Sequence, residues 1–368
     1  MLLEGIFLPL TTPFHADGRL FLRKLEYNVG RYSLTPAAGM VVLGREGEGD
    51  SLTDRESVEV LKTAIGAAAD EKVMIANVGR ESVSATLELV EAAASAGYDA
   101  VAVRPPWDWM ASMEAELDLY FRAIADHSPV PVVVVNDLKS FHHSHVVGQL
   151  AGHPQIIGAI HAEHAAPPRL KGLVVPISPH RHLTGLIEVA AEARREVTVT
   201  TTFAAVTGRM LKHGEPSGNF VSAASLGGTA TVTVPVVSGL KTRTRKVGFQ
   251  VLAGSSRTML DCWGLGATGA VPRLAAAAPQ ACCEVWQAFK DGDPALAAEK
   301  QERVRLAAEL VEGTAGSSET IAVRRGIAAL KYGCDLNGYY GGHPRLPLLG
   351  LTGDQRAEME RTLSGLRN

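Results

Sequence analysis

The sequence predicts an α/β protein in which helices cover parallel strands. Short apolar runs rich in β-branched residues recur along the chain, and stretches with helical spacing of apolar residues separate them. Continuous apolar runs are typical of strands that helices cover on both faces. Because strand and helix alternate, right-handed crossovers lead either to a closed eight-stranded barrel or to an open doubly wound sheet. The alternation alone does not separate these two folds.

The individual elements follow from the same patterns. Helices are expected where a hydroxyl or acid side chain precedes apolar residues at helical spacing, as in 53–61 and 82–94. From residue 277 onward only helical stretches follow, including 281–289 and the charged run 295–311, which predicts a helical appendix after the last strand. The expected strands lie at 5–9, 39–44, 73–77, 100–104, 130–135, 155–160, 197–203, 249–253 and 269–272.

Composition and charge exclude several classes of function. Hydrophobic residues make up 46% of the chain and charged residues 20%, which are the values of a globular protein with a core. The net charge of -3 supplies no broad positive field, so we expect no nucleic-acid partner. Four cysteines are too few and too poorly spaced for a disulfide scaffold or a four-ligand zinc site, which favours a cytoplasmic protein. No apolar run approaches the ~18 residues of a membrane helix, so we expect no membrane partner.

The middle of the chain, about residues 161–246, departs from the strand and helix rhythm. It is rich in proline and then in small residues, and it is too apolar to be a linker. A structureless loop of this length is improbable inside a compact domain, so the segment should have structure of its own. The predicted domains are a barrel over 1–275 that contains this atypical segment, and a C-terminal helical domain over 276–368.

Several motifs occur in the order that one enzyme superfamily shows. Residues 12–18 read Thr-Pro-Phe-His-Ala-Asp-Gly, and Gly-Arg-Glu-Gly-Glu at 44–48 is followed by Ser-Leu-Thr-Asp-Arg-Glu at 51–56. With them, the chain resembles the dihydrodipicolinate synthase and N-acetylneuraminate lyase superfamily of class I aldolases. The segment 338–347 resembles most closely the 4-hydroxy-2-oxoglutarate aldolase branch. Further matching segments lie at 79–86, 97–105, 249–256 and 264–271.

The resemblance implies both a fold and an activity. It implies a TIM barrel, with the active site at the C-terminal ends of the strands, followed by a helical bundle. It implies a lyase that acts on a small 2-oxo or hydroxy carboxylic acid, with no cofactor, and that forms homo-oligomers, commonly dimers or tetramers. In this superfamily a strand-borne lysine forms an imine with a 2-oxo acid, because a protonated imine lets a carbanion form beside it.

The residues that the resemblance assigns to this chemistry are changed here. Ile160 stands where the superfamily has its lysine, and a one-residue shift puts His161 there instead. The superfamily tyrosine is replaced by Val135, and the paired threonines are replaced by Arg45 and Glu46. The usual imine reaction therefore requires a relocated lysine.

Three residues are catalytic candidates. Glu46 or His161 would move protons. Lys212 would form the imine if the sixth barrel strand came from the second part of the atypical segment, and a solvated loop lysine is the alternative. Arg45 would bind a carboxylate through two guanidinium donors, although Arg45 and Glu46 would otherwise form a surface ion pair.

The substrate-binding candidates come mainly from the matching motifs. Lys139 follows Asn136 by three residues and lies where the superfamily has a carboxylate-binding arginine, with a surface lysine as the alternative. The full set is Thr12, Arg45, Gly47, Trp107, Asn136, Lys139, Gly254, Ser255 and Arg273.

Two other functions stay open at this point. A catalytically silent relative would use the same pocket to bind a small acid or would serve as an assembly subunit. A metal-assisted lyase would use the histidines concentrated between residues 142 and 182, since clustered imidazoles bind divalent ions. Their spacing matches no established metal motif, so solvated loop histidines are the default and we assign no metal ligand.

Overall fold

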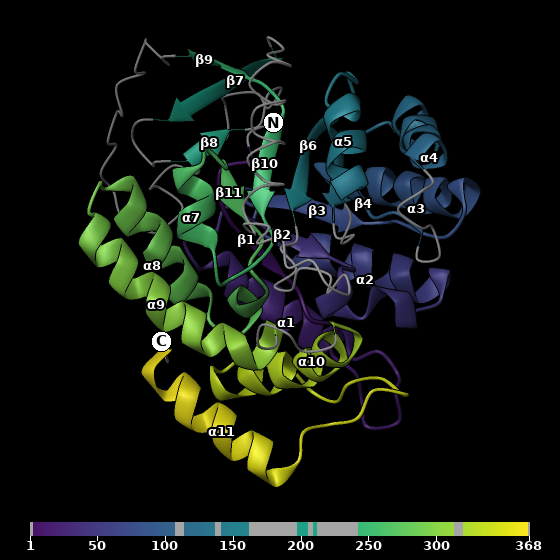
Figure 1. Cartoon of the computed structure of the whole chain (residues 1–368). Coiled ribbons are helices and arrows are strands. Elements are labelled where there is room, and N and C mark those ends of the chain that lie inside the picture. The colour runs from purple at the N-terminus through teal and green to yellow at the C-terminus, as the bar shows by residue number, and fades with distance from the viewer. Residues whose placement is uncertain are drawn as a thin grey trace, which may run out of the picture. The chain divides into compact units, whose positions relative to one another are not determined.

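The computed structural model describes residues 3–106, 114–136, 141–161, 197–204, 209–211, 242–312 and 319–366. Eight of the described strands pair in parallel and close into a barrel, because β1 pairs with β2 on one side and with β11 on the other (Figure 1). The closed ring confirms the barrel and excludes the open sheet. Its strands are β1 (Gly5–Pro9), β2 (Gly39–Val42), β3 (Val73–Asn77), β4 (Ala100–Val103), β5 (Val132–Asn136), β6 (Ile156–His161), β10 (Gln250–Ala253) and β11 (Gly269–Ala270).

Helices follow the strands in the expected places. Thr53 begins α2 through a reciprocal capping box with Glu56, and the Ser82 hydroxyl accepts a hydrogen bond from the Ala85 amide at the start of α3. Such caps satisfy backbone donors that have no partner within the helix. The helices of the barrel part are α1 (Leu22–Ser33), α2 (Asp54–Ala67), α3 (Val83–Ala96), α4 (Glu114–His127), α5 (Phe141–Leu150) and α7 (Met259–Gly264).

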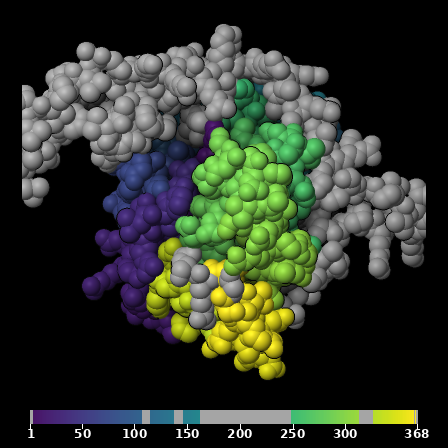
Figure 2. Space-filling view, turned by 90° about the vertical axis from the view of Figure 1, so that its left-hand side faces the viewer, coloured from purple at the N-terminus to yellow at the C-terminus, as the bar shows by residue number. Residues whose placement is uncertain are grey.

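A group of helices follows the last barrel strand, as predicted. The C-terminal residues, drawn in yellow and yellow-green, lie beside N-terminal residues in purple (Figure 2). One contact of this kind joins Asn28 on α1 to Tyr340, where the Asn28 side chain donates to the Tyr340 carbonyl and accepts from its amide, both at 2.8 Å. The division between domains near residue 275 stays a prediction. The helices are α8 (Pro279–Lys290), α9 (Pro294–Glu312), α10 (Glu319–Leu336) and α11 (Gly353–Leu363).

Apolar residues form two clusters, one inside the barrel and one between strands and helices. Along each strand successive side chains point to opposite faces. In β5, Val133 belongs to the inner cluster and Val134 to the outer one. In β6, Ile160 belongs to the inner cluster and Ala159 to the outer one. This alternation determines which side chains at the strand ends face the barrel interior.

Three strands of the atypical segment form a separate antiparallel sheet. The strands β7 (Val197–Ala204), β8 (Arg209–Leu211) and β9 (Thr242–Val247) pair in the order β8-β7-β9. The predicted strand at 197–203 is therefore present but is not a barrel strand. The sixth barrel strand is β6, which pairs with β5 and β10. The idea that the sixth strand comes from the second part of the atypical segment is wrong, since the uninterrupted apolar run before residue 161 already fills that place.

Within the part of the chain that the structure describes, no helix is both long enough and apolar enough to cross a lipid bilayer.

Candidate functional site

A small cavity of about 70 Å³ lies at the carboxyl ends of the barrel strands. In TIM barrels this end carries the chemistry, because the loops that follow the strands meet there. Apolar side chains of the inner cluster and charged side chains from the loops line the cavity together. The apolar side chains include Val41, Val135, Ile160 and Val271, and the polar ones are Arg45, Glu46, Asp50, Asn77, Arg80, Arg104 and Arg273.

The loop after β2 brings Arg45 and Glu46 to this cavity. Arg45 and Glu46 form a short 3-10 turn with Gly47. Gly47 packs against the loop that follows β1. A Cβ atom at Gly47 would lie 2.8 Å from the Leu10 carbonyl oxygen and 3.3 Å from the Thr12 hydroxyl oxygen, so glycine alone fits there. Thr12 is buried beneath this turn.

The same loop is held in a costly backbone conformation. Leu43 and Glu48 flank it and adopt positive φ angles of 64° and 52°, which side chains other than glycine rarely adopt. Glu48 is buried and forms an ion pair with the equally buried Lys331 of α10, and it accepts a hydrogen bond of 2.7 Å from the Arg345 amide. Burial lowers the pKa of Lys331, whereas the Glu48 carboxylate acts in the opposite sense. Lys331 is therefore a buried anchor for the loop, which the sequence reasoning missed.

Glu46 and Arg273 form an ion pair at the cavity. The Arg273 Nε atom lies 2.9 Å from Glu46 Oε1, and the two side chains are 18% and 14% exposed. Arg273 directly follows the loop after β11, and Glu46 follows β2, so the pair joins the two strands that flank β1. Three predicted site residues, Arg45, Glu46 and Arg273, thus line one cavity.

Two further arginines line the cavity and were missed. Arg80 and Arg104 follow the adjacent strands β3 and β4. Arg80 donates to Asp54 at 3.2 Å, and Arg104 donates to Asp50 at 2.8 Å and to Glu81 at 3.2 Å. Both arginines stand inside segments that match the superfamily motifs, and each comes shortly after an expected strand. Their position at the end of an expected strand was the signal in the sequence that could have identified them as site residues.

Asn136 and His161 lie opposite each other at the ends of β5 and β6. Both are buried, and the Asn136 Nδ2 amide donates to His161 Nδ1 at 3.0 Å. Their neighbours Val135 and Ile160 line the cavity, but Asn136 and His161 are not among its described lining residues. Strand alternation explains this, since consecutive side chains face opposite sides of the sheet.

The other predicted residues occupy varied positions. Gly254 lines the cavity, and its amide donates to the His161 carbonyl at 2.7 Å. The Ser255 hydroxyl instead donates to Glu312 Oε2 of α9 at 2.8 Å. Trp107, Lys139 and Lys212 lie outside the described residues.

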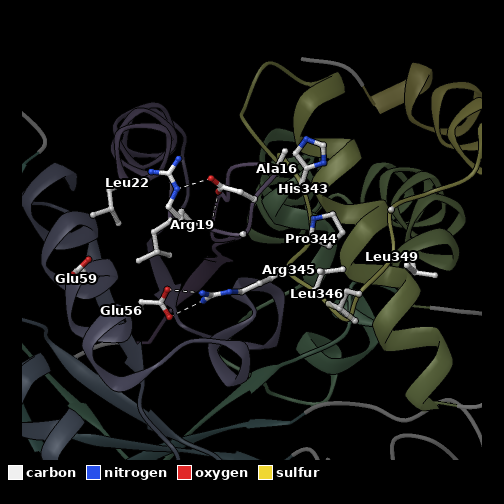
Figure 3. Close-up of a pocket in the computed structure, with 15 residues that line it drawn as sticks. Ala16, Arg19, Leu22, Glu56, Glu59, His343, Pro344, Arg345, Leu346 and Leu349 are labelled. Carbon is white, nitrogen blue, oxygen red and sulfur yellow. Dashed lines mark hydrogen bonds and ion pairs between the residues drawn. The ribbon is translucent and has the colours of Figure 1, made fainter.

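A larger groove of about 800 Å³ lies elsewhere (Figure 3). Residues 16–22, α2 and residues 343–350 line it, so it is not formed by the strand ends. In this groove Arg345 donates to both carboxylate oxygens of Glu56, at 2.9 and 2.8 Å (Figure 3). Hydrogen bonds from Arg345 and Thr53 lower the pKa of Glu56 to about 2. Because the active site of a TIM barrel lies at the carboxyl ends of its strands, we take the smaller cavity as the candidate site.

In the described part of the chain, no group of three or more His, Cys, Asp or Glu residues is arranged to hold a metal ion. Most of the predicted histidine cluster is not tested by this, because His164, His180 and His182 lie outside the described residues. The same is true of the side chains of residues 142–145.

Comparison with known proteins identifies the family. The sequence profile of the dihydrodipicolinate synthetase family matches residues 2–162 and 229–366. The chain belongs to this family. Its relatives include the L-threo-3-deoxy-hexylosonate aldolase of Hypocrea jecorina, 25% identical, with 99% of this chain and 95% of the relative covered. The 4-hydroxy-tetrahydrodipicolinate synthase of Methanothrix thermoacetophila is 26% identical, with 98% and 96% covered.

Solved structures of the dihydrodipicolinate synthetase family share the fold. YagE of E. coli K12, solved in complex with pyruvate, aligns with a TM-score of 0.73 and 21% identity over 100% of this chain and 99% of that chain. The dihydrodipicolinate synthase DapA-2 of Bacillus anthracis aligns with a TM-score of 0.71 and 19% identity over 100% of both chains. The expected TIM barrel with C-terminal helices is thereby confirmed.

Proposed function

We propose that this protein is a lyase that acts on a small 2-oxo or hydroxy carboxylic acid bound in the cavity at the strand ends. The observation that supports this most is the joint presence of Arg45, Glu46 and Arg273 around one cavity in a member of an aldolase family. Guanidinium groups bind carboxylates through paired hydrogen bonds, and a carboxylate at the same cavity is a suitable base.

The proposed roles follow from this arrangement. Arg45 and Arg273 bind the substrate carboxylate and stabilise negative charge as it develops. Glu46 is the general base, and Arg273 holds it in place through the 2.9 Å contact. His161 stays a prediction as the alternative group that moves protons, because Ile160 and not His161 is among the described lining residues. We assign no cofactor to the reaction.

A cleavage step with these groups balances for a 4-hydroxy-2-oxo acid. The Glu46 carboxylate takes the proton of the 4-hydroxyl, the bond between carbons 3 and 4 breaks, and carbon 4 leaves as an aldehyde. The electron pair passes to the 2-oxo group as an enolate beside the arginines. Glu46 then returns its proton to carbon 3, which yields the shorter 2-oxo acid.

Whether an imine takes part depends on lysines outside the described residues. Lys212 remains our candidate for an imine former, although its expected place on the sixth strand is filled by β6. A second function, binding of a small acid without turnover, is favoured by one specific observation. Ile160 and Val135 line the cavity where the family resemblance expects lysine and tyrosine.

One experiment separates these proposals. Pyruvate is incubated with the protein in D₂O, and proton NMR follows the loss of its methyl signal, which requires a carbanion or enolate at carbon 3. We expect exchange with the wild-type protein and a rate at least ~100-fold lower for Glu46→Gln. No exchange with the wild-type protein would refute the lyase and leave the silent binder. Borohydride reduction and peptide mapping of a parallel sample locate any imine, and an adduct on Lys212 would establish its role.

The remaining properties are proposed with the function. We propose a cytoplasmic homo-oligomer, a dimer or tetramer, with a small carboxylate as its partner and with domains at 1–275 and 276–368. Size-exclusion chromatography with light scattering measures the oligomeric state directly.

A further inference from the structure

The turn that carries Arg45 and Glu46 ends at a residue whose backbone is strained. Glu48 directly follows the turn with a φ angle of 52°, and its neighbours on both sides, Gly47 and Gly49, are glycines. Glycine adopts positive φ angles without strain, whereas a residue with a Cβ atom does not. Because a third glycine would be the less strained residue here, we expect the Glu48 side chain to have a role that glycine lacks.

The partner of this side chain adds a second unfavourable feature. Glu48 is 3% exposed and pairs with Lys331, which is 1% exposed. Removing two opposite charges from water costs about as much free energy as their attraction returns, and apolar residues of similar volume often stabilise a fold equally well. Strained backbone and buried ionisable groups concentrate at functional sites. Both features lie within two residues of Glu46, the proposed base.

Lys331 connects segments that are far apart in the sequence. Its ammonium group pairs with Glu48, donates to the His343 carbonyl at 2.8 Å and lies 4.4 Å from the centre of the Phe14 ring. The Glu48 carboxylate also accepts from the Arg345 amide at 2.7 Å. The end of the turn is therefore held by α10, by residues 343–345 and by the loop after β1 together.

The backbone around Glu48 has little room to move by itself. A Cβ atom would lie 2.8 Å from a backbone carbonyl oxygen at Gly47 and 2.2 Å from one at Gly49. A shift of Glu48 therefore moves the whole turn, including Glu46, whose Oε1 atom lies 2.9 Å from Arg273 Nε. Misplacement of a catalytic group by ~1 Å can lower a rate about 100-fold.

We propose that Glu48 and Lys331 are positioning residues, whose buried pair fixes the turn so that the Glu46 carboxylate meets both Arg273 and the substrate. This inference rests on the proposed function for the role of Glu46 as the base. It gives α10, on which the sequence reasoning placed no site residue, a part in the reaction. The pair acts through the turn, so its loss lowers the rate more than the stability.

Replacement of the whole pair by uncharged side chains of similar length tests this. Glu48→Gln combined with Lys331→Met leaves no buried charge unpaired, and the glutamine oxygen still accepts from the Arg345 amide. We expect a free energy of unfolding close to that of the wild-type protein. For the exchange of pyruvate protons in D₂O, we expect a kcat at least tenfold lower and a KM changed less than about threefold. A variant that loses stability but keeps the wild-type kcat per folded protein would overturn the inference.

A shorter acid provides the test if the double variant does not fold, as judged by circular dichroism. Glu48→Asp keeps the charge for Lys331 but shortens the side chain by one methylene group, so the turn is pulled out of place. We expect the same loss of kcat with little change in KM. A wild-type kcat for Glu48→Asp would overturn the inference.

A second readout needs no turnover. A double-mutant cycle of Glu46→Gln and Arg273→Gln measures how strongly these two residues are coupled in the free energy of unfolding. We expect this coupling to fall to less than half in the Glu48→Gln/Lys331→Met protein, and an unchanged coupling would overturn the inference. If the wild-type protein exchanges no protons, the lyase is refuted, whereas a reduced coupling still supports the positioning role.

Glu284→Gln combined with Lys300→Met is the matched control. Glu284 and Lys300 form an ion pair of 2.7 Å between α8 and α9. We expect this control to keep the wild-type kcat and the wild-type coupling. A tenfold loss of kcat in the control as well would show that the loss is not specific to the turn, and would overturn the inference.

Discussion

The ion pair between Glu46 and Arg273 supports both the architecture and the proposed chemistry of the cavity, so Arg273→Gln is the most informative single change. The pair has a short contact of 2.9 Å, and its side chains are 14% and 18% exposed. Exposed pairs contribute about 0–1 kcal/mol, whereas loss of one partner from a buried pair costs about 3–5 kcal/mol. An intermediate loss of roughly 1–3 kcal/mol in the free energy of unfolding is expected for Arg273→Gln.

The same change removes a donor from the substrate carboxylate. A hydrogen bond to a charged group contributes about 1.5–3 kcal/mol, which corresponds to roughly a tenfold to hundredfold loss of affinity for pyruvate. Thermal unfolding and calorimetric titration measure the two effects on the same sample. Arg55→Gln is the matched control, because it removes an arginine whose side chain is 90% exposed. We expect it to leave both quantities close to those of the wild-type protein.

A double-mutant cycle with Glu46→Gln isolates the pair. If Glu46 and Arg273 interact as described, the two changes together destabilise the protein less than the sum of the single changes, by roughly 0.5 kcal/mol or more. Strict additivity, or an Arg273→Gln protein that resembles Arg55→Gln in both stability and affinity, would refute the reasoning.

Two further predictions concern the Glu56–Arg345 pair and two glycines, Gly49 and Gly66. The pKa of Glu56 is lowered to about 2, so its pair with Arg345 stabilises the fold above pH ~4.5 and the stabilisation is lost as the pH falls toward 2. Solvent screening reduces the contribution of this pair to the free energy of unfolding to about 1–2 kcal/mol. Urea unfolding at pH 5 and pH 3 should therefore show a smaller loss of stability at the lower pH for Arg345→Gln than for the wild-type protein. Gly49→Ala should destabilise the protein by roughly 2 kcal/mol or more, since its Cβ would lie 2.2 Å from the Leu43 carbonyl oxygen. Gly66→Ala, in open space on α2, should raise the free energy of unfolding by about 0.5–1 kcal/mol. A Gly49→Ala protein that is more stable than the Gly66→Ala protein would contradict both expectations.

The strands of the barrel were predictable because each is a continuous apolar run, which reflects burial on both faces. The motif order then favoured a closed barrel, and the pairing of β1 with β11 confirms it. The residue at the end of β6 was not predictable, since sequence spacing alone allowed either Ile160 or His161 to face inward. The paired strands decide this, because Ile160 packs in the inner cluster with Leu252 and Val133.

The parts of the site that sequence reasoning missed depend on contacts between distant segments. Arg80 and Arg104 lie inside matching motifs, but only barrel closure brings them together, because it places the ends of β3 and β4 at one cavity. The buried pair of Glu48 with Lys331 joins the loop after β2 to α10, and no local pattern marks a lysine that is 1% exposed. Long-range ion pairs of this kind leave no periodic signal in the sequence.

A crystal structure of the wild-type protein soaked with pyruvate tests the central claim most directly, because it shows where a 2-oxo acid binds. The account predicts density for pyruvate in the cavity at the strand ends, with its carboxylate in contact with the guanidinium groups of Arg45 and Arg273. Pyruvate bound only in the groove beside Arg345, or an empty cavity at a saturating concentration, would contradict it.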